Sequence, residues 1–164
     1  MIIITCIIVL YSLALLLIFM YALAQLNLLF NYLSAQNKID ISKLFDFSNP
    51  SEIPFVTIQL PVYNEMYVME RLLDNIAKID YPKNKLQIQV LDDSTDESLK
   101  KTAEHIKKLQ VSGLNIIHML RDTREGFKAG ALKEGLKSAT GEFIAIFDAD
   151  FLPDSNWLRQ TVPH

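Results

Sequence analysis

The chain has 164 residues, of which 50% are hydrophobic, and its formal net charge is −3 at pH 7. This slightly acidic balance offers no basic excess of the kind that nucleic-acid binding requires, so we expect no nucleic-acid partner. The single cysteine, Cys6, excludes an intrachain disulfide and a cysteine-based metal site.

The N-terminal segment is apolar and carries no charged side chain from residue 1 to residue 24. A helix over residues 2–24 would be about 35 Å long, enough to cross a hydrocarbon core of about 30 Å. The segment lacks the basic start and the cleavage site of a signal peptide. We therefore expect residues 1–36 to be an uncleaved membrane anchor with an interfacial extension; the alternative is a buried helix. Lys38 and Lys43 favour a cytoplasmic location for the chain that follows.

An alternation of strand and helix patterns follows a linker, which we place at residues 37–54. Short apolar runs predict strands at 55–60, 86–91, 114–120 and 143–147, and Pro61 is expected to end the first of them. Helical spacing predicts helices that contain residues 69–76, 99–110, 129–139 and 153–162, and Ser94 and Glu97 form a capping-box pattern before the second helix. This alternation predicts an α/β domain over residues 55–164, with a parallel sheet and flanking helices.

The fourth predicted strand, residues 143–147, runs directly into Asp148 and Asp150. A continuous apolar run of this kind is typical of a strand buried on both faces of a parallel sheet. In extended backbone, the side chains of residues i and i+2 point the same way, so the two carboxylates could hold one divalent cation, Mg²⁺ or Mn²⁺. The alternative is a strand-to-helix turn in which Asp150 or Asp154 caps the next helix.

Parallel strands end at one edge of the sheet, where ligands of such folds bind. The loops expected at this edge carry polar and ionisable groups after every strand: Tyr63, Asn64 and Glu65; Asp92 and Asp93; Arg121, Arg124 and Lys128; Asp148 and Asp150. Carboxylates can hold a cation, and basic side chains and helix N-termini can bind phosphates. The pattern predicts a site for a phosphate-bearing ligand and a metal, although the basic residues could instead be solvated. The three histidines form no metal cluster, and His118, inside the third strand, is expected to be structural.

Four motifs occur in order along the chain: LPVYNE at 60–65, VLDDSTD at 90–96, REGFKAGAL at 124–132 and FDAD at 147–150. With these motifs the chain resembles the family 2 glycosyltransferases. The likeness is to the membrane-bound cellulose-synthase-like branch, which includes plant glucomannan and xyloglucan-backbone synthases and their bacterial relatives. It extends from residue 55 to about residue 163.

The resemblance implies a GT-A fold, a nucleotide-sugar donor of the UDP-glucose or GDP-mannose class, a glycan or other hydroxyl acceptor, a divalent cation and inversion at the anomeric carbon. It also implies a role for each matching position. Tyr63 and Glu65 would line the nucleoside pocket, Asp92 and Asp93 would contact the base and ribose, Lys128 would touch the base or diphosphate, and Asp148 and Asp150 would form the D-x-D pair, with Asp150 as the direct metal ligand.

Three features of the family have no counterpart before His164: the catalytic base in a T/S-E-D motif, the acceptor-binding Q-x-x-R-W motif and further membrane helices. We therefore expect the chain to be the donor-binding part of a longer glycosyltransferase, with no catalytic base of its own and no transfer activity in isolation.

Three other functions fit parts of the pattern. A phosphatase of the haloacid-dehalogenase type also has a strand followed by D-x-D, but there the pair normally ends the first strand. A nucleotidyltransferase usually has a glycine-rich loop after its first strand, where this chain has residues 61–65. The remaining alternative is a membrane-tethered nucleotide-binding module without transfer activity.

Overall fold

The structure, a computed structural model, describes residues 2–35, 47, 49 and 51–164. The chain divides into two units, an N-terminal helix and an α/β unit, and each is described by itself. The predicted linker falls largely on residues outside the described ranges.

The first unit is helix α1, Ile2–Ala35, which contains no charged residue. Residues Ile2–Ser34 are long and apolar enough to cross a membrane, which makes α1 a candidate span. Its leucine and isoleucine side chains are exposed, as a lipid-facing helix requires. Near its end, Asn31 Nδ2 donates to Asn27 Oδ1 at 2.7 Å, so these two amide side chains partly satisfy each other.

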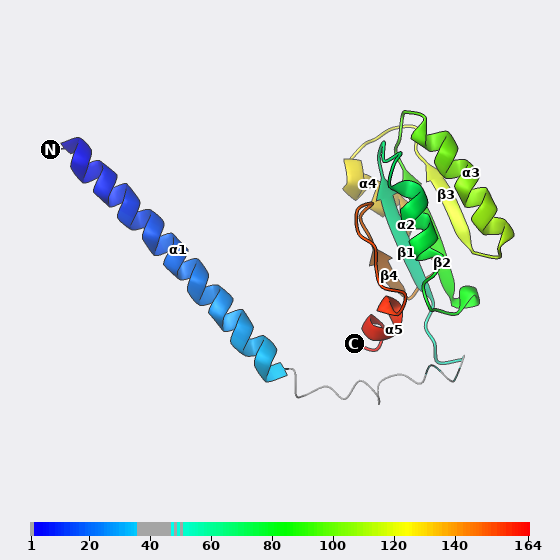
Figure 1. The fold of residues 1–164 in the computed structure, drawn as a ribbon, viewed down its shortest axis with the longest axis horizontal. Coiled ribbons are helices and arrows are strands. Elements are labelled where there is room, and N and C mark those ends of the chain that lie inside the picture. Colours follow the sequence, from blue (N-terminus) through cyan, green and yellow to red (C-terminus); the bar gives the residue numbers. More distant parts are fainter. Residues whose placement is uncertain (1, 36–46, 48, 50) are drawn as a thin grey trace. The chain divides into compact units, whose positions relative to one another are not determined.

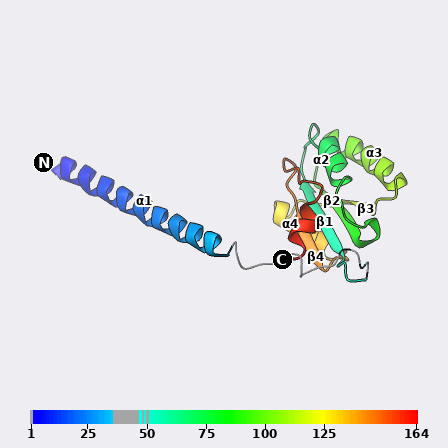
Figure 2. The same cartoon turned by 60° about the horizontal axis from the view of Figure 1, so that its bottom comes forward.

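The second unit is a four-stranded parallel sheet in the order β3-β2-β1-β4. The strands are β1 (Val56–Val62), β2 (Leu86–Asp92), β3 (Ile116–Leu120) and β4 (Phe143–Ile146). The helices are α2 (Met69–Ile76), α3 (Ser98–Val111), α4 (Phe127–Leu136) and α5 (Trp157–Thr161), with a 3-10 turn, η2 (Lys83–Lys85). Helices α2 and α3 cover one face of the sheet and α4 covers the other (Figures 1 and 2). The predicted α/β class and parallel sheet are confirmed.

The face of the sheet towards α2 and α3 is apolar. Ile58 and Leu60 of β1 and Val90 of β2 are buried there against Leu72 of α2 and Ile106 of α3. These residues alternate along their strands, so every second side chain enters this core.

The face of the sheet towards α4 is polar, which the sequence analysis did not predict. Four of the side chains that β1 and β2 place on this face, Thr57, Gln59, Gln87 and Gln89, are polar, and all four are buried. They bond in pairs across the two strands, with Thr57 Oγ1 donating to Gln87 Oε1 at 2.8 Å and Gln59 Nε2 donating to Gln89 Oε1 at 2.9 Å. Gln59 Nε2 also reaches the carbonyl of Leu132 in α4, at 3.5 Å. These hydrogen bonds satisfy most of the polar atoms on this face, which would be costly to bury alone, and leave the buried Oε1 of Gln59 without a partner among the described residues.

Strand β1 continues through Pro61 to Val62, so the prediction that Pro61 ends the strand was wrong. Every second residue of a strand directs its backbone groups to the same side. The carbonyl of Gln59 accepts a hydrogen bond from Phe147 N, just after β4, at 3.1 Å, so the nitrogen of Pro61, two residues later, also points towards β4. The pairing of β1 with β4 has ended at Ile146. The missing N–H of Pro61 therefore removes no hydrogen bond from the ladder.

Strand β4 is an edge strand of the described sheet and is not buried on both faces, contrary to the prediction. Phe143 and Ile146 each remain 48% exposed, whereas Ala145 is buried. The reason is that β4 pairs only with β1, and α4 packs against β1 and β2. An apolar run indicates that a strand can be covered, but it does not identify what covers it.

Helix α3 begins at Ser98, and its N-cap residue Glu97 makes no side-chain capping bond, so the predicted capping box was wrong. Instead, Asp96 Oδ1 accepts the N–H of Ser98 at 3.0 Å. Ser94 turns towards the neighbouring loop, where its hydroxyl oxygen accepts the backbone N–H of Asn64 at 2.8 Å. Ser94 therefore belongs to a contact between the loops after β1 and β2.

Candidate functional site

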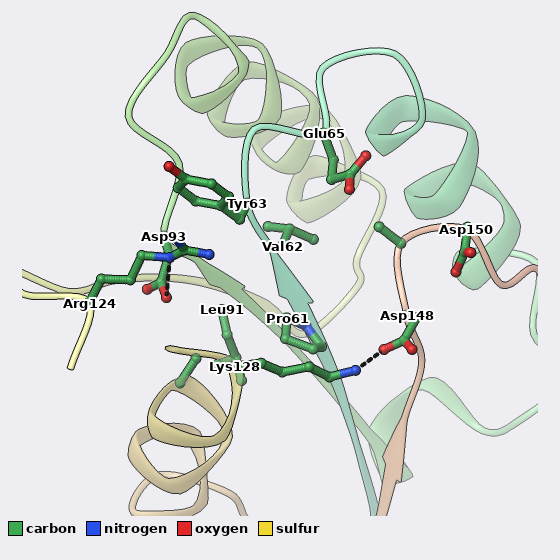
Figure 3. Close-up of a pocket in the computed structure, with 12 residues that line it drawn as sticks. Pro61, Val62, Tyr63, Glu65, Leu91, Asp93, Arg124, Lys128, Asp148 and Asp150 are labelled. Atoms are coloured by element: carbon green, nitrogen blue, oxygen red, sulfur yellow. Dashed lines mark hydrogen bonds and ion pairs between the residues drawn. The ribbon is translucent and has the colours of Figure 1, made fainter. Parts of the chain in front are cut away.

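A cavity of about 370 Å³ opens at the carboxyl ends of β1, β2 and β4 (Figure 3). Its walls are the loops that follow these strands, the loop before α4 and the first turns of α4. Its polar lining residues are Tyr63, Glu65, Asp93, Arg124, Lys128, Asp148 and Asp150. Six of the seven residues expected to bind a nucleotide-sugar or a metal therefore come together here, and Asp92 is the exception.

Asp148 and Asp150 lie just beyond β4, in a turn that is closed by a hydrogen bond from Phe151 N to Asp148 O at 3.0 Å. The prediction that extended backbone aligns the two side chains was therefore wrong, although both still line the cavity. The capping alternative is not supported, because α5 begins at Trp157 and its N-cap residue Asn156 makes no side-chain capping bond.

The two carboxylates fit a divalent cation only if other ligands complete the shell. Within the described ranges, no group of three or more His, Cys, Asp or Glu side chains could hold a metal by itself. Asp148 and Asp150 are both exposed to the cavity, and carboxylate oxygens are suitable donors for Mg²⁺ or Mn²⁺. Mg²⁺ usually takes its remaining ligands from water and substrate phosphates, so this arrangement suits a cation that arrives with a phosphate ligand.

Lys128, in the first turn of α4, reaches across the cavity and forms an ion pair with Asp148 (Figure 3). Both side chains are more than half exposed, so this contact is open to competition from ligands. A cation at Asp148 would displace the ammonium group by like-charge repulsion. Lys128 would then be free to bind a phosphate oxygen a short distance away.

The opposite end of the cavity has a flat cationic and aromatic surface. The guanidinium carbon of Arg124 lies 3.3 Å from the centroid of the Tyr63 ring, and Arg124 Nε lies 3.8 Å from Asp93 Oδ2. A second hollow, of about 360 Å³, shares Tyr63, Asp93 and Arg124 with the first. Planar groups on this surface can stack with a nucleobase, and polar groups at its edge can bond to it.

The hydrogen bonds of Arg121 hold the loop before α4 in place. Its Nε donates to Asp93 Oδ1 at 2.8 Å, while Nη1 and Nη2 donate to the carbonyls of Glu125 at 2.8 Å and Phe127 at 3.0 Å. The hydrogen bond with Asp93 raises the pKa of Arg121 above its usual value. Of the two arginines that the sequence could not assign, Arg124 therefore faces the cavity and Arg121 supports it.

Glycines allow this loop to fold onto α4. Gly126 has a φ of +69°, which favours glycine, and it directly precedes the helix. A side chain at Gly130 would overlap the carbonyl oxygen of Glu125, the same oxygen that Arg121 binds. The loop can therefore pack tightly enough to point Arg124 and Lys128 into one cavity.

Asp92 is buried and lies outside the first cavity, with 3% of its surface exposed. Its Oδ2 is 2.9 Å from His118 Nε2, and its Oδ1 accepts the N–H of Ser94 at 2.9 Å. Burial by itself would raise the pKa of Asp92, but these hydrogen bonds outweigh it and hold the pKa below its usual value. Direct contact between Asp92 and a ligand stays a prediction.

Two contributions to the site were missed in the sequence analysis: the stacking of Arg124 on Tyr63 and the role of Asn64. Asn64 adopts a left-handed backbone, with φ of +56°, and its Oδ1 accepts the N–H of Thr95 at 2.9 Å. Asparagine tolerates this conformation better than most residues, so an asparagine directly after a strand was an available signal. The stacking partner of Tyr63 had no comparable signal, because the two residues are 61 positions apart.

A family model described as "Glycosyl transferase family 2" matches residues 57–164, which include all four motifs. The chain belongs to glycosyl transferase family 2. The resemblance inferred from the motifs is thereby confirmed, and the ligand edge of the sheet lies within the matched residues.

Curated relatives of this family 2 chain include plant polysaccharide synthases. The chain is 45% identical over 117 residues to glucomannan 4-beta-mannosyltransferase 7 of Arabidopsis thaliana. The aligned region covers 67% of this chain and 20% of that protein. It is 42% identical over 117 residues to glucomannan 4-beta-mannosyltransferase 1 of Oryza sativa subsp. japonica, covering 69% and 22%. The chain thus spans about a fifth of the length of these relatives.

Solved structures confirm the GT-A fold of the family 2 domain. A mannosyltransferase from Pyrobaculum calidifontis, PcManGT, in complex with GDP-Man and Mn²⁺ has a TM-score of 0.60 and 37% identity, covering 70% of this chain and 33% of that chain. S. aureus TarS (residues 1–349) in complex with UDP has a TM-score of 0.57 and 28% identity, covering 66% and 31%. The first of these structures contains GDP-Man and Mn²⁺, and the second contains UDP.

Proposed function

We propose that this chain forms the donor-binding part of a membrane-anchored glycosyltransferase that takes a mannosyl group from GDP-mannose and transfers it, with inversion, to a glycan acceptor. The observation that carries the proposal is the single cavity shared by Asp148, Asp150, Lys128 and Tyr63, set in a family 2 domain. The choice of GDP-mannose over UDP-glucose is supported by the mannosyltransferase relatives and by the 37% identity to PcManGT.

Different residues of the cavity would bind different parts of the donor. Asp148 and Asp150 would hold a Mg²⁺ or Mn²⁺ ion against the diphosphate, with Asp150 as the direct ligand. When bound, the cation would stabilise negative charge on the departing nucleoside diphosphate. Lys128 would donate to a phosphate oxygen, which adds a second positive charge at the same place. Tyr63 and Arg124, which stack on each other, would offer a planar surface to the base, and Asp93 and Glu65 would bond to the nucleoside.

Anchoring to a bilayer follows from the same proposal. Helix α1 would hold the domain at the membrane surface, and the lysines after it, Lys38 and Lys43, favour a cytoplasmic α/β unit. A membrane-anchored domain of this kind would act on an acceptor that is elongated at the membrane.

The test is calorimetric titration of the detergent-solubilised chain with GDP-mannose and UDP-glucose, each with and without Mn²⁺. We expect GDP-mannose to bind more tightly, and only weakly without Mn²⁺. Substitution Asp150→Ala should abolish the gain from Mn²⁺, because the cation loses a carboxylate ligand. Asp154→Ala is the matched control, since Asp154 is an exposed aspartate four residues later that does not line the cavity. If Asp150→Ala bound GDP-mannose as well as the wild type in Mn²⁺, the metal assignment would be wrong.

A further inference from the structure

His118 belongs to β3 and is not among the residues that line the two hollows of the site. Its side chain is 14% exposed, and its Nε2 is 2.9 Å from Oδ2 of Asp92, whose side chain is 1% exposed. Because an ionised carboxylate only accepts hydrogen bonds, Nε2 of His118 is the donor. A carboxylate buried to this degree is costly without such partners.

A chain of hydrogen bonds leads from this pair to the loops of the site. Asp92 Oδ1 accepts the N–H of Ser94 at 2.9 Å, and the Ser94 hydroxyl oxygen accepts the N–H of Asn64 at 2.8 Å. Asn64 Oδ1 then accepts the N–H of Thr95 at 2.9 Å. The loops after β1 and β2 are therefore fastened to each other and, through Asp92, to His118.

The fastened loops carry the residues at the nucleoside end of the cavity. Tyr63 directly precedes Asn64, and Asp93 lies between Asp92 and Ser94. The residues at the metal end come from elsewhere: Asp148 follows β4, and Lys128 belongs to α4. The hydrogen-bond chain therefore reaches one end of the site and not the other.

We infer that His118 is a positioning residue for nucleoside recognition: acting through Asp92, Ser94 and Asn64, it sets where Tyr63 and Asp93 lie. This inference rests on the proposed function, because it assigns the nucleoside of the donor to the end of the cavity at Tyr63. A residue with this role affects the affinity for the nucleoside and leaves the affinity for the metal and diphosphate unchanged. A residue that only stabilises the fold weakens both.

The chain provides a matched control. His105 in α3 also pairs with an aspartate, Asp74, through Nε2 at 2.8 Å, and its side chain is also 14% exposed. This second pair joins α3 to α2 and does not involve a loop of the site. Substitutions at His105 therefore control for the loss of a histidine–aspartate pair, although Asp74 is 53% exposed and, unlike Asp92, keeps access to water when its partner is lost.

The experiment measures binding of two probes to the full chain in detergent with Mn²⁺: GDP, which contains the nucleoside, and inorganic pyrophosphate, which does not. We expect His118→Phe to weaken GDP binding by about tenfold, the loss of roughly one positioned hydrogen bond, with pyrophosphate binding unchanged. His118→Gln, whose amide can donate to Asp92, should restore GDP binding. His105→Phe should change neither probe.

A second variant covers the case in which His118→Phe fails to fold because Asp92 loses its partner. Ser94→Ala cuts the hydrogen-bond chain further along and leaves His118 and Asp92 paired, and it should show the same selective loss of GDP binding. Equal losses for GDP and pyrophosphate in Ser94→Ala and His118→Phe, or no loss for either probe, would overturn the inference. If the wild-type chain bound neither probe, the proposed function itself would fail.

Discussion

Lys128 occupies a position where one side chain can serve two partners. In the structure it forms an ion pair with Asp148, and both side chains are more than half exposed. Exposed pairs of this kind contribute about 0–1 kcal/mol to stability, so the contact is easily exchanged. A cation bound with a diphosphate would be held by Asp148, and the diphosphate would be a new anionic partner for Lys128.

Replacing Lys128 with methionine tests this exchange. We expect the affinity for GDP in Mn²⁺ to fall by about tenfold or more, since a charge-assisted hydrogen bond is lost, with the thermal midpoint nearly unchanged. Calorimetry and thermal unfolding would measure the two quantities. Lys133→Met is the control, because Lys133 is on the same helix but outside the cavity. Unchanged GDP affinity in Lys128→Met would assign Lys128 to the solvated helix start that the sequence also allowed.

Helix α4 is held against the sheet by a close contact at Gly135. A Cβ atom there would lie 2.5 Å from Gln59 Nε2 and 2.9 Å from Leu91 Cδ2. Gln59 cannot easily move away, because its amide bonds both Gln89 and the carbonyl of Leu132. The contact sets the distance between α4 and the sheet, and with it the reach of Lys128 into the cavity.

Gly135→Ala should therefore destabilise the domain although alanine favours helix by about 1 kcal/mol. We expect a net loss of about 1–3 kcal/mol from overpacking, measured by chemical denaturation. Lys133→Ala, at an exposed position of the same helix, should have little effect and controls for helix propensity. A Gly135→Ala variant as stable as the wild type would show that Gln59 can rotate away at little cost.

The elements show which parts of the structure could be predicted from the sequence. Apolar periodicity is a local property, and it predicted the order and type of all four strands. The path of β1 through Pro61 and the exposure of β4 depend on which strands are neighbours, which periodicity does not specify. The polar face under α4 did have a signal, since Gln87 and Gln89 alternate with apolar residues in β2. It was missed because residues 86–91 were interpreted only as an apolar run, without regard to this alternation.

The site, like the fold, could be predicted only in part. The motifs predicted that Asp148, Asp150 and Lys128 lie at one edge of the sheet, because parallel strands run in the same direction. The hydrogen bonds of Arg121 to Asp93 and the burial of Asp92 against His118 arise from contacts between residues 26–28 positions apart in the sequence. Such contacts depend on side-chain packing, so sequence spacing could not distinguish the supporting residues from those that face the cavity.

At the scale of the whole molecule, the α/β unit begins at a segment held by Tyr81. The hydroxyl of Tyr81 donates to the carbonyl of Pro54, just before β1, at 2.7 Å, and the ring is packed edge-on against Phe47 with centroids 6.3 Å apart. Burial, followed by the negative charge of Glu142, raises the pKa of Tyr81 to about 12. This tyrosine fixes the start of the folded unit. Its ionisation is less favourable in the folded state than in the unfolded state.

This shift predicts a loss of stability in alkali. Below pH 10, the hydroxyl is protonated in the folded and unfolded states, and the contribution of Tyr81 is fully present. As the pH rises from about 10 to about 12, the unfolded state loses its proton first, so the free energy of unfolding falls, by on the order of 2–3 kcal/mol. Tyr81→Phe should be less stable by about 1 kcal/mol at neutral pH and should show a smaller fall over this range. Tyr67→Phe, at a side chain that is 90% exposed, is the control for general effects of losing a hydroxyl. If urea denaturation at pH 8, 10 and 11 gave parallel declines for the wild type and Tyr81→Phe, the alkaline loss would belong to other groups, and the assignment to Tyr81 would be wrong.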